Sequence, residues 1–344
     1  MRPSRESQHE KELGGQLLAS VSRSFYLTLK ALPTALREPI SLAYLLARTA
    51  DTIADTAAVP AADRLSLLAG YQSAIDQNST APAEPTMLDS LRADFCPHQT
   101  DEAERRLLER TADGLAWLRT LDDDSRQSIR EVLRHIIGGQ TLDIQRFPSS
   151  TALRSLSTRA ELDDYTWQVA GCVGQFWTQI CSTQMPHAFL PGTDLQEQNE
   201  LGIRLGKALQ LINILRDLGE DLDDGRCYLP EADWAPLGLD LQTLASKPES
   251  LRPVWEDWLK VCCHHLDAGL TYVQRIADGR LRYATALPLL LGAQTVTIMR
   301  QATWPQVLAS IKISRLDVAS ILAKAALACR NPEAIAALYG KLMG

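Results

Sequence analysis

Residues 201–221, LGIRLGKALQLINILRDLGED, repeat apolar side chains at the spacing of an α-helix. At about 100° per residue, one broad face collects Leu201, Leu205, Leu209, Ile212, Leu215 and Leu218. A narrow stripe outside that face carries Gln210, Asn213, Asp217 and Asp221. Helical periodicity is widespread along the other segments, whereas the alternation typical of strands never persists. The sequence therefore predicts an all-α protein.

The two aspartates that end this stripe conflict with the electrostatics of a helix. Asp217 and Asp221 lie one turn apart, with about 5–6 Å between Cβ atoms, where like charges repel each other. They also lie near the predicted C-terminal end, where the helix dipole disfavours anions. A divalent cation would remove both problems, because Mg2+ typically takes one or two carboxylates plus substrate phosphates. On this segment alone, a solvated acidic turn and a metal site are equally good interpretations.

A second segment, ISLAYLLARTADTIADT at residues 40–56, repeats the pattern. Its polar stripe carries Tyr44, Arg48, Asp51 and Asp55. Paired aspartates on two facing helices would hold a small Mg2+ cluster, and Arg48 and Arg216 would bind the phosphate oxygens that complete it. An acidic stripe at the mouth of an apolar cavity suits the ionisation of a prenyl diphosphate, because the carbocation must be kept from water. The sequence offers no base and water beside the phosphate, which a phosphohydrolase would need.

Composition and organisation narrow the function further. The chain has 344 residues and a net charge of −7, without a basic stripe, so nucleic-acid binding is a weak hypothesis. The predicted loops, marked by Pro, Gly, Asn and Asp, are too short to be domain linkers. We therefore expect one domain over residues 1–344, with a core at about 18–325 and short terminal extensions. The seven cysteines include no CxxC pair, and the run at 262–265 is better explained by a helix with core and surface faces than by a metal site.

The expected location is the cytoplasm. The first residues, MRPSRESQHEKELGG, lack the apolar core of a signal peptide, and the cysteines are expected to be free thiols. The uncharged stretch at 283–299 is a little short for a membrane span and holds Pro288 and Gly292, so we interpret it as a buried helix or helix pair. A transient contact with a membrane surface stays open, since the sequence neither requires nor excludes it.

Four segments together resemble the squalene/phytoene synthase family of head-to-head prenyltransferases. They are SVSRSF (20–25), YLLARTADTIADT (44–56), YTWQVAGCVG (165–174) and ALQLINILRDLGEDLDDGRCYLP (208–230). The last is highly specific, because it joins an acidic element to a downstream Gly-Arg and an aromatic-Leu-Pro. The resemblance covers roughly residues 18–325 and implies a single isoprenoid-synthase-type helical domain around a central cavity.

The resemblance also implies roles for individual residues. The residues matching those that bind Mg2+ and the diphosphates are Asp51, Asp55, Asp217 and Asp221. The basic residues matching those that contact phosphate are Arg23, Arg48, Arg216 and Arg226. The polar residues matching those around the substrate are Ser22, Tyr44, Gln210 and Asn213. Tyr165 matches a tyrosine proposed to assist the first half-reaction, and Asp143, in HIIGGQTLDIQRF, resembles an aspartate near the second substrate.

Two features of the resemblance favour squalene as the product. Phytoene synthases usually carry a second Asp at the position of Thr52, where squalene synthases usually carry Thr. The segment 286–322 resembles the squalene synthase region that contributes to the NADPH site, and Lys312 and Arg315 match basic residues there. No GxGxxG follows a strand, so a Rossmann-type cofactor site is not expected.

The sequence-based hypothesis is the condensation of two farnesyl diphosphates to presqualene diphosphate, followed by NADPH-dependent reduction to squalene. Two alternatives remain. One is a non-reductive family member that makes presqualene diphosphate, hydroxysqualene or a carotenoid precursor such as phytoene. The other is a non-catalytic helical assembly factor, which the presence of all four aspartates disfavours.

Overall fold

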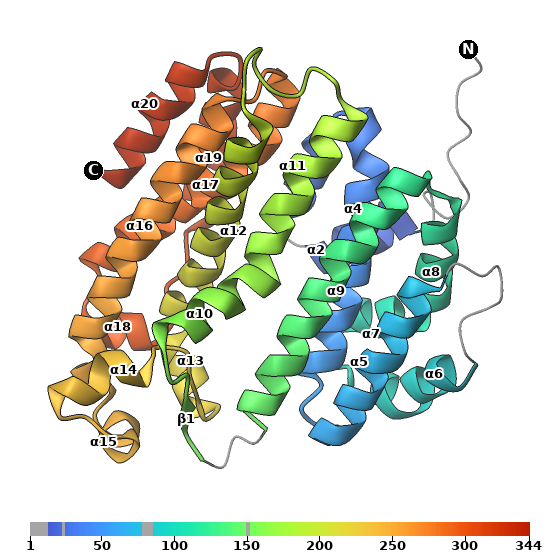
Figure 1. The fold of residues 1–344 in the computed structure, drawn as a ribbon. Helices are drawn as coiled ribbons and strands as arrows, with labels where there is room; N and C mark the ends of the chain where they lie inside the picture. The colour runs from blue at the N-terminus through green and yellow to red at the C-terminus, as the bar shows by residue number, and fades with distance from the viewer. Residues whose placement is uncertain (1–12, 23–24, 78–84, 149–151) are drawn as a thin grey trace, which may run out of the picture. The chain divides into compact units, whose positions relative to one another are not determined.

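A computed structural model describes residues 13–22, 25–77, 85–148 and 152–344. The chain divides into two compact units (Figure 1), the first formed by Met1–Gln145 and Thr183–Met185 and the second by Arg146–Ser182 and Pro186–Gly344. The expectation of a single domain therefore stays a prediction.

The first unit is built from helices that gather around α4. Its helices are α2 (Leu18–Ser22), α3 (Phe25–Ala31), α4 (Thr34–Asp55), α5 (Ala61–Asp76), α6 (Pro85–Ser90), α7 (Glu102–Glu109), α8 (Thr111–Thr120) and α9 (Asp123–Arg146). Helix α4 buries an apolar face that includes Leu42, Leu46 and Ile53, and it packs against α5, α7 and α8. Arg130 of α9 closes the end of α5, donating hydrogen bonds to the carbonyls of Ile75 (2.8 Å) and Gln77 (2.7 Å).

The second unit has long helices joined by short ones. They are α10 (Arg159–Thr166), α11 (Cys172–Gln184), α12 (Leu195–Arg216), α13 (Leu218–Asp223), α14 (Glu231–Trp234), α15 (Leu241–Ser246), α16 (Arg252–Gln274), α17 (Gly279–Gln301), α18 (Trp304–Leu308), α19 (Arg315–Ala328) and α20 (Pro332–Met343). Two short strands, β1 (Arg154–Ser155) and β2 (Arg226–Cys227), pair in parallel. Figure 1 shows α20 beside α16 and α17, which it contacts.

Helix α12 is the centre of the second unit because glycines let other segments approach it closely. It packs along α16 and against the π-helical turn Trp167–Gly171. A Cβ atom placed on Gly206 would lie 2.1 Å from the Ala170 carbonyl oxygen, and one on Gly174 would lie 1.9 Å from that of Gly202. Only glycine fits such close backbone contacts. These contacts fix α12 against the turn and α11.

The structure confirms the all-α prediction for the described residues, corrects the length of one predicted helix and confirms the buried helix expected at 283–299. The helix expected over 201–221 is broken: α12 ends at Arg216, Asp217 adopts φ −99° and ψ 14°, and α13 begins at Leu218. The stretch 283–299 lies inside the single helix α17, which is mostly buried. Within the described ranges, no helix combines the length and apolarity needed to cross a membrane.

Candidate functional site

The first predicted carboxylate pair lies at the C-terminal end of α4. Asp51 is half-buried, and its Oδ1 accepts a hydrogen bond of 2.6 Å from Nε2 of Gln140 on α9. Asp55 is the last residue of α4 and is exposed. Arg48, one turn before Asp51, interacts electrostatically with both carboxylates. The structure therefore keeps the predicted order of a guanidinium followed by two carboxylates along one helix.

The Asp51 carboxyl holds its proton unusually tightly. Burial, followed by the nearby charge of Asp55, raises its pKa from an ordinary 3.8 to about 7, although Arg48 and the Gln140 hydrogen bond act in the opposite direction. Two adjacent carboxylates at this end of a helix are poorly stabilised without a compensating cation. The donor set is thus of the kind that a hard divalent cation prefers.

Other predicted residues of the first unit lie on α4 itself and on α2. Arg48 forms an ion pair with Glu104 of α7. The Tyr44 hydroxyl donates to the Val21 carbonyl at 3.2 Å, and its ring stacks on that of Phe25 with centroids 5.2 Å apart. Ser22 is buried, and its hydroxyl donates to the Leu18 carbonyl of its own helix. Arg23 lies outside the described residues.

Asp143 belongs to the same unit, on α9 three residues after Gln140. Its side chain is half-buried. Residues three apart on a helix share a face, so Asp143 lies on the side of α9 that carries the partner of Asp51.

The second predicted pair lies at the junction of α12 and α13. Asp217 is the residue between the two helices, and its backbone carbonyl accepts from the Asp221 N–H at 2.9 Å, so the two residues remain one turn apart. The Arg216 guanidinium binds the Asp217 carboxylate through two hydrogen bonds, of 2.8 and 2.5 Å. The Ser310 hydroxyl also donates to Asp217, at 3.0 Å. Asp221 is 3.2 Å from the Arg226 guanidinium. Each carboxylate of this pair therefore has a cation beside it.

The aromatic residue predicted to act in catalysis is packed in a small aromatic group. Tyr165, on α10, is buried and stacks on Tyr228 with ring centroids 5.0 Å apart and planes 17° apart. Phe147 contacts Tyr228 edge-on, with ring centroids 5.2 Å apart. Tyr228 follows two residues after Arg226, so the same short segment supports the tyrosine and reaches the Asp221 carboxylate.

The remaining predicted residues of the second unit are less enclosed. Asn213 is exposed, and its amide donates to the Gln210 side chain one turn earlier, at 3.4 Å. Lys312 and Arg315 are both exposed, on either side of the N-terminal end of α19. Exposed cations at this spacing are chemically suited to bind phosphate groups.

The four predicted metal ligands fall into two pairs, one in each unit. Asp51 and Asp55 belong to the first unit, and Asp217 and Asp221 to the second. Among the described residues, no three His, Cys, Asp or Glu side chains come together closely enough to hold a metal ion. The cysteine-histidine run at 262–265 accordingly forms no such group.

Four supporting residues were missed by the sequence analysis. Gln140 and Glu104 bind Asp51 and Arg48, Ser310 binds Asp217, and Tyr228 stacks on Tyr165. Tyr228 lies inside the family motif at 208–230, and Gln140 lies one turn before Asp143, so the neighbouring sequence could have indicated both. No sequence motif indicated Glu104 or Ser310.

Comparison with known proteins identifies the family. The sequence profile of the Squalene/phytoene synthase family matches residues 18–317. The chain therefore belongs to this family of prenyl-transferring isoprenoid synthases, as its motifs had indicated.

Its relatives include enzymes of both types. The chain is 28% identical to the squalene synthase of Eremothecium gossypii over 83% of its own length and 61% of that protein. It is 29% identical to the 15-cis-phytoene synthase of Synechocystis over 64% of its length and 56% of the relative. It spans about six tenths of the length of the squalene synthases of Schizosaccharomyces pombe and Eremothecium gossypii.

Solved structures agree on the fold. A chain of TcSQS, in complex with a ligand, aligns with a TM-score of 0.73 at 20% identity, covering 95% of this chain and 87% of the other. A dehydrosqualene synthase in complex with a ligand aligns with a TM-score of 0.57 at 21% identity, covering 92% and 93%. These alignments confirm the predicted isoprenoid-synthase-type helical fold.

Proposed function

We propose that the protein joins two molecules of farnesyl diphosphate head to head and reduces the product to squalene. The observation that supports this most directly is the occurrence, in a chain of this family, of two carboxylate pairs that each lie beside a guanidinium. In the first half-reaction, C1 of the donor bonds to C2 and C3 of the acceptor as a cyclopropane, and one diphosphate and one proton leave. In the second, presqualene diphosphate loses its diphosphate, rearranges and accepts a hydride.

The proposal gives the predicted site residues the following roles. Asp51, Asp55, Asp217 and Asp221 would hold Mg2+, which when bound neutralises diphosphate charge and makes it a better leaving group. Arg48, Arg216 and Arg226 bind phosphate oxygens. The Tyr165 ring offers its face to the carbocation, and its hydroxyl holds a proton or a phosphate oxygen.

The other predicted polar residues orient the substrates. In this proposal these residues are Ser22, Arg23, Tyr44, Asp143, Gln210 and Asn213. Lys312 and Arg315 would bind the phosphates of NADPH, which when bound supplies the hydride. Their exposure fits a cofactor that binds from solvent.

A non-reductive product is the second candidate, and the similarity to phytoene synthases favours it. A bifunctional lycopene cyclase/phytoene synthase of Phaeosphaeria nodorum is 30% identical over 67% of this chain and 36% of that protein. The residue at position 52, a threonine, disfavours this candidate. Its side chain is buried and donates to the Arg48 carbonyl at 2.9 Å, so this position supplies no third carboxylate on α4.

Substitution of one carboxylate in each pair tests the proposal. We expect Asp51→Asn and Asp217→Asn each to lower turnover of farnesyl diphosphate by roughly 100-fold or more, because each change removes a carboxylate that would hold the Mg2+ neutralising the leaving diphosphate. The thermal melting curves should stay cooperative. Asp223→Asn is the matched control, since Asp223 is exposed and has no proposed role, and it should keep full activity. Full activity with ordinary Mg2+ dependence in Asp51→Asn and Asp217→Asn contradicts the assignment.

Binding measurements separate the enzyme from a non-catalytic assembly factor. Calorimetric titration with inorganic diphosphate should show binding that requires Mg2+ in the unmodified chain and is lost in Asp217→Asn. Absence of Mg2+-dependent binding in the unmodified chain favours the assembly factor.

A further inference from the structure

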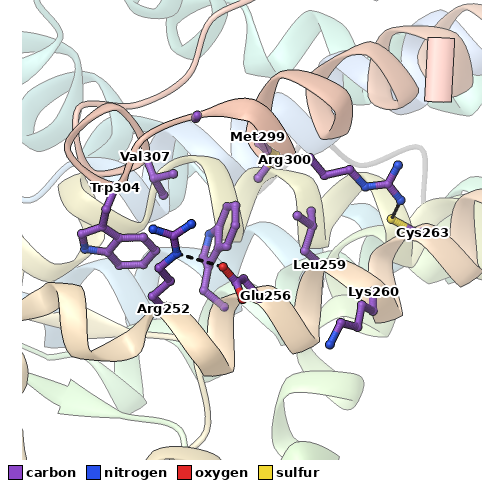
Figure 2. Close-up of a pocket in the computed structure, with 11 residues that line it drawn as sticks. Arg252, Glu256, Leu259, Lys260, Cys263, Met299, Arg300, Trp304 and Val307 are labelled. Atoms are coloured by element: carbon purple, nitrogen blue, oxygen red, sulfur yellow. Dashed lines mark hydrogen bonds and ion pairs between the residues drawn. The ribbon is translucent and has the colours of Figure 1, made fainter. Parts of the chain in front are cut away.

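A cavity of about 240 Å³ lies in the second unit beside α16, the C-terminal end of α17 and α18 (Figure 2). Its floor is formed by buried apolar side chains, Trp255, Leu259, Met299, Trp304 and Val307. The Trp255 N–H donates to the Leu215 carbonyl at 2.8 Å, so its polar edge is already satisfied. The Trp255 and Trp304 rings meet edge to face with centroids 5.9 Å apart. The floor is thus suited to a flat or chain-like apolar group.

Charged side chains surround this floor. Three cations and one carboxylate line the cavity: Arg252, Lys260, Arg300 and Glu256. Arg252 pairs with Glu256, and Lys260 pairs with Asp257, each at 2.8 Å. All of these paired side chains are about half exposed or more, so water screens both pairs strongly. The rim therefore has an excess of positive charge in a protein whose net charge is −7.

Among the described residues, Arg300 is the cation of this rim without a carboxylate partner. Its guanidinium donates to the Met343 carbonyl at 3.1 Å and to Cys263 Sγ at 3.0 Å, as Figure 2 shows for Cys263. Burial raises the pKa of the Cys263 thiol, so this acceptor is neutral at pH 7. Within the described parts of the chain, no carboxylate forms an ion pair with Arg300. An anion in the cavity would supply the missing charge.

The size and chemistry of the cavity specify its occupant. Its volume equals that of roughly eight water molecules at about 30 Å³ each, which suits a short chain rather than a farnesyl group. We propose that this cavity is a second binding site, separate from the carboxylate pairs, for a small amphiphilic phosphate monoester. The phosphate binds Arg300 and its neighbouring cations, and the apolar chain covers the indoles.

Helix α18 connects this cavity to the second carboxylate pair. It supplies Trp304 and Val307 to the floor, and it packs against α13, where a Cβ on Gly219 would lie 2.0 Å from the Leu308 carbonyl oxygen. Ser310, two residues after α18, donates to Asp217 at 3.0 Å. A ligand that holds α18 in this position therefore favours diphosphate binding at Asp217. This coupling, unlike the binding site itself, rests on the proposed function.

The binding site is tested with octyl phosphate, whose eight-carbon chain matches the cavity. Calorimetric titration is done in EDTA, so that phosphate cannot bind through Mg2+ at the carboxylates. We expect saturable one-to-one binding that falls at least tenfold in Arg300→Gln, which removes the unpaired charge, and in Ala302→Phe, which fills the cavity from its lining. Lys247→Gln, at an exposed lysine outside the cavity, is the control and should bind normally.

Other probes identify what the site recognises. Octyltrimethylammonium, with the same chain and the opposite charge, and inorganic phosphate, without the chain, should each bind at least tenfold more weakly. Absence of octyl phosphate binding overturns the proposal, as does binding that both cavity variants leave unchanged. Binding of the unmodified chain only to phosphatidylglycerol vesicles would overturn it too, because the occupant would then be a bilayer surface. Thermal melts of both variants show whether they remain folded.

The coupling is tested with Mg2+ and inorganic diphosphate. Saturating octyl phosphate should tighten diphosphate binding by about fivefold or more, and Arg300→Gln should abolish this effect. Weaker diphosphate binding in both proteins would mean competition at the carboxylates and would overturn the coupling. If octyl phosphate binds in EDTA but diphosphate fails to bind at all, the proposed function fails while the second site stands.

Discussion

At the scale of single residues, Asp51 carries the clearest electrostatic conflict in the first unit. Its carboxylate is half-buried and lies one turn from Asp55, and neither the nearby Arg48 nor the hydrogen bond from Gln140 offsets these effects. A structural residue at this place would be better served by an uncharged side chain. The conflict is understandable if the pair exists to bind a cation, because the ion removes the repulsion when it binds.

The raised pKa of Asp51 predicts how stability depends on pH in EDTA. From pH 4 to 7 the folded chain keeps the Asp51 proton while the unfolded chain has lost it, so the free energy of unfolding falls as pH rises. A pKa change from 3.8 to about 7 corresponds to at most about 4 kcal/mol. Urea unfolding at pH 5 and 8 should show that Asp51→Asn loses this part of the slope, whereas Asp223→Asn keeps it. Equal slopes in Asp51→Asn and the unmodified chain would contradict the burial of this charge.

The sequence located the acidic residues and the arginines beside them, but not their partners on distant segments. The spacing of Asp51 and Asp217 within helical stripes was enough to single them out. Their side-chain partners Gln140 and Ser310 lie 89 and 93 residues away along the chain. Such pairs depend on tertiary packing, which no local periodicity contains. The roles of the predicted site residues stay predictions until the substitutions are made.

At the scale of elements, the junction of α12 and α13 differs most from expectation. Periodicity predicted one helix through Asp221, because the apolar pattern persists to that residue. In the structure, backbone hydrogen bonds of the helical type also continue across the break. The break at Asp217 turns α13 so that Gly219 meets the backbone of Leu308. That contact involves a segment about 90 residues later in the sequence, so local pattern could not predict it.

The glycine contacts of α12 predict a stability difference between two identical substitutions. Gly206→Ala should lower the free energy of unfolding by about 1–3 kcal/mol or more, because the new Cβ would meet the Ala170 carbonyl 2.1 Å away. Gly340→Ala in α20 has nothing within 4 Å and should raise it by up to about 1 kcal/mol through helix propensity. Urea denaturation measures both. A Gly206→Ala protein as stable as the unmodified chain would mean that these segments are not in close contact.

At the scale of the whole molecule, the described residues are predominantly helical. The composition and the helical periodicity predicted the fold class correctly. They did not distinguish one domain from two compact units, because that distinction depends on contacts between elements. Nor could they reveal which apolar side chains remain exposed. Leu316 and Leu327 of α19 are 83% and 85% exposed, although their helix is rich in Ala and Leu.

These two leucines predict a contact with anionic membrane surfaces. At about 100° per residue they share one stripe of α19, with Arg315 on one side and Lys324 on the other. Vesicles with equal phosphatidylglycerol and phosphatidylcholine should sediment the protein, and the double variant Leu316→Ser with Leu327→Ser should bind at least tenfold more weakly. Leu237→Ser, at another exposed leucine, is the control. Unchanged vesicle binding by the double variant would remove α19 from the contact.

The most direct test of the central claim is to incubate the protein with farnesyl diphosphate and Mg2+, with and without NADPH, and to identify the extracted lipids by mass. The account predicts squalene when NADPH is present and presqualene diphosphate or a derived alcohol when it is absent. The same coupled product under both conditions would contradict the reductive step and the role given to Lys312 and Arg315. No coupled product from farnesyl diphosphate under either condition would contradict the proposed condensation itself.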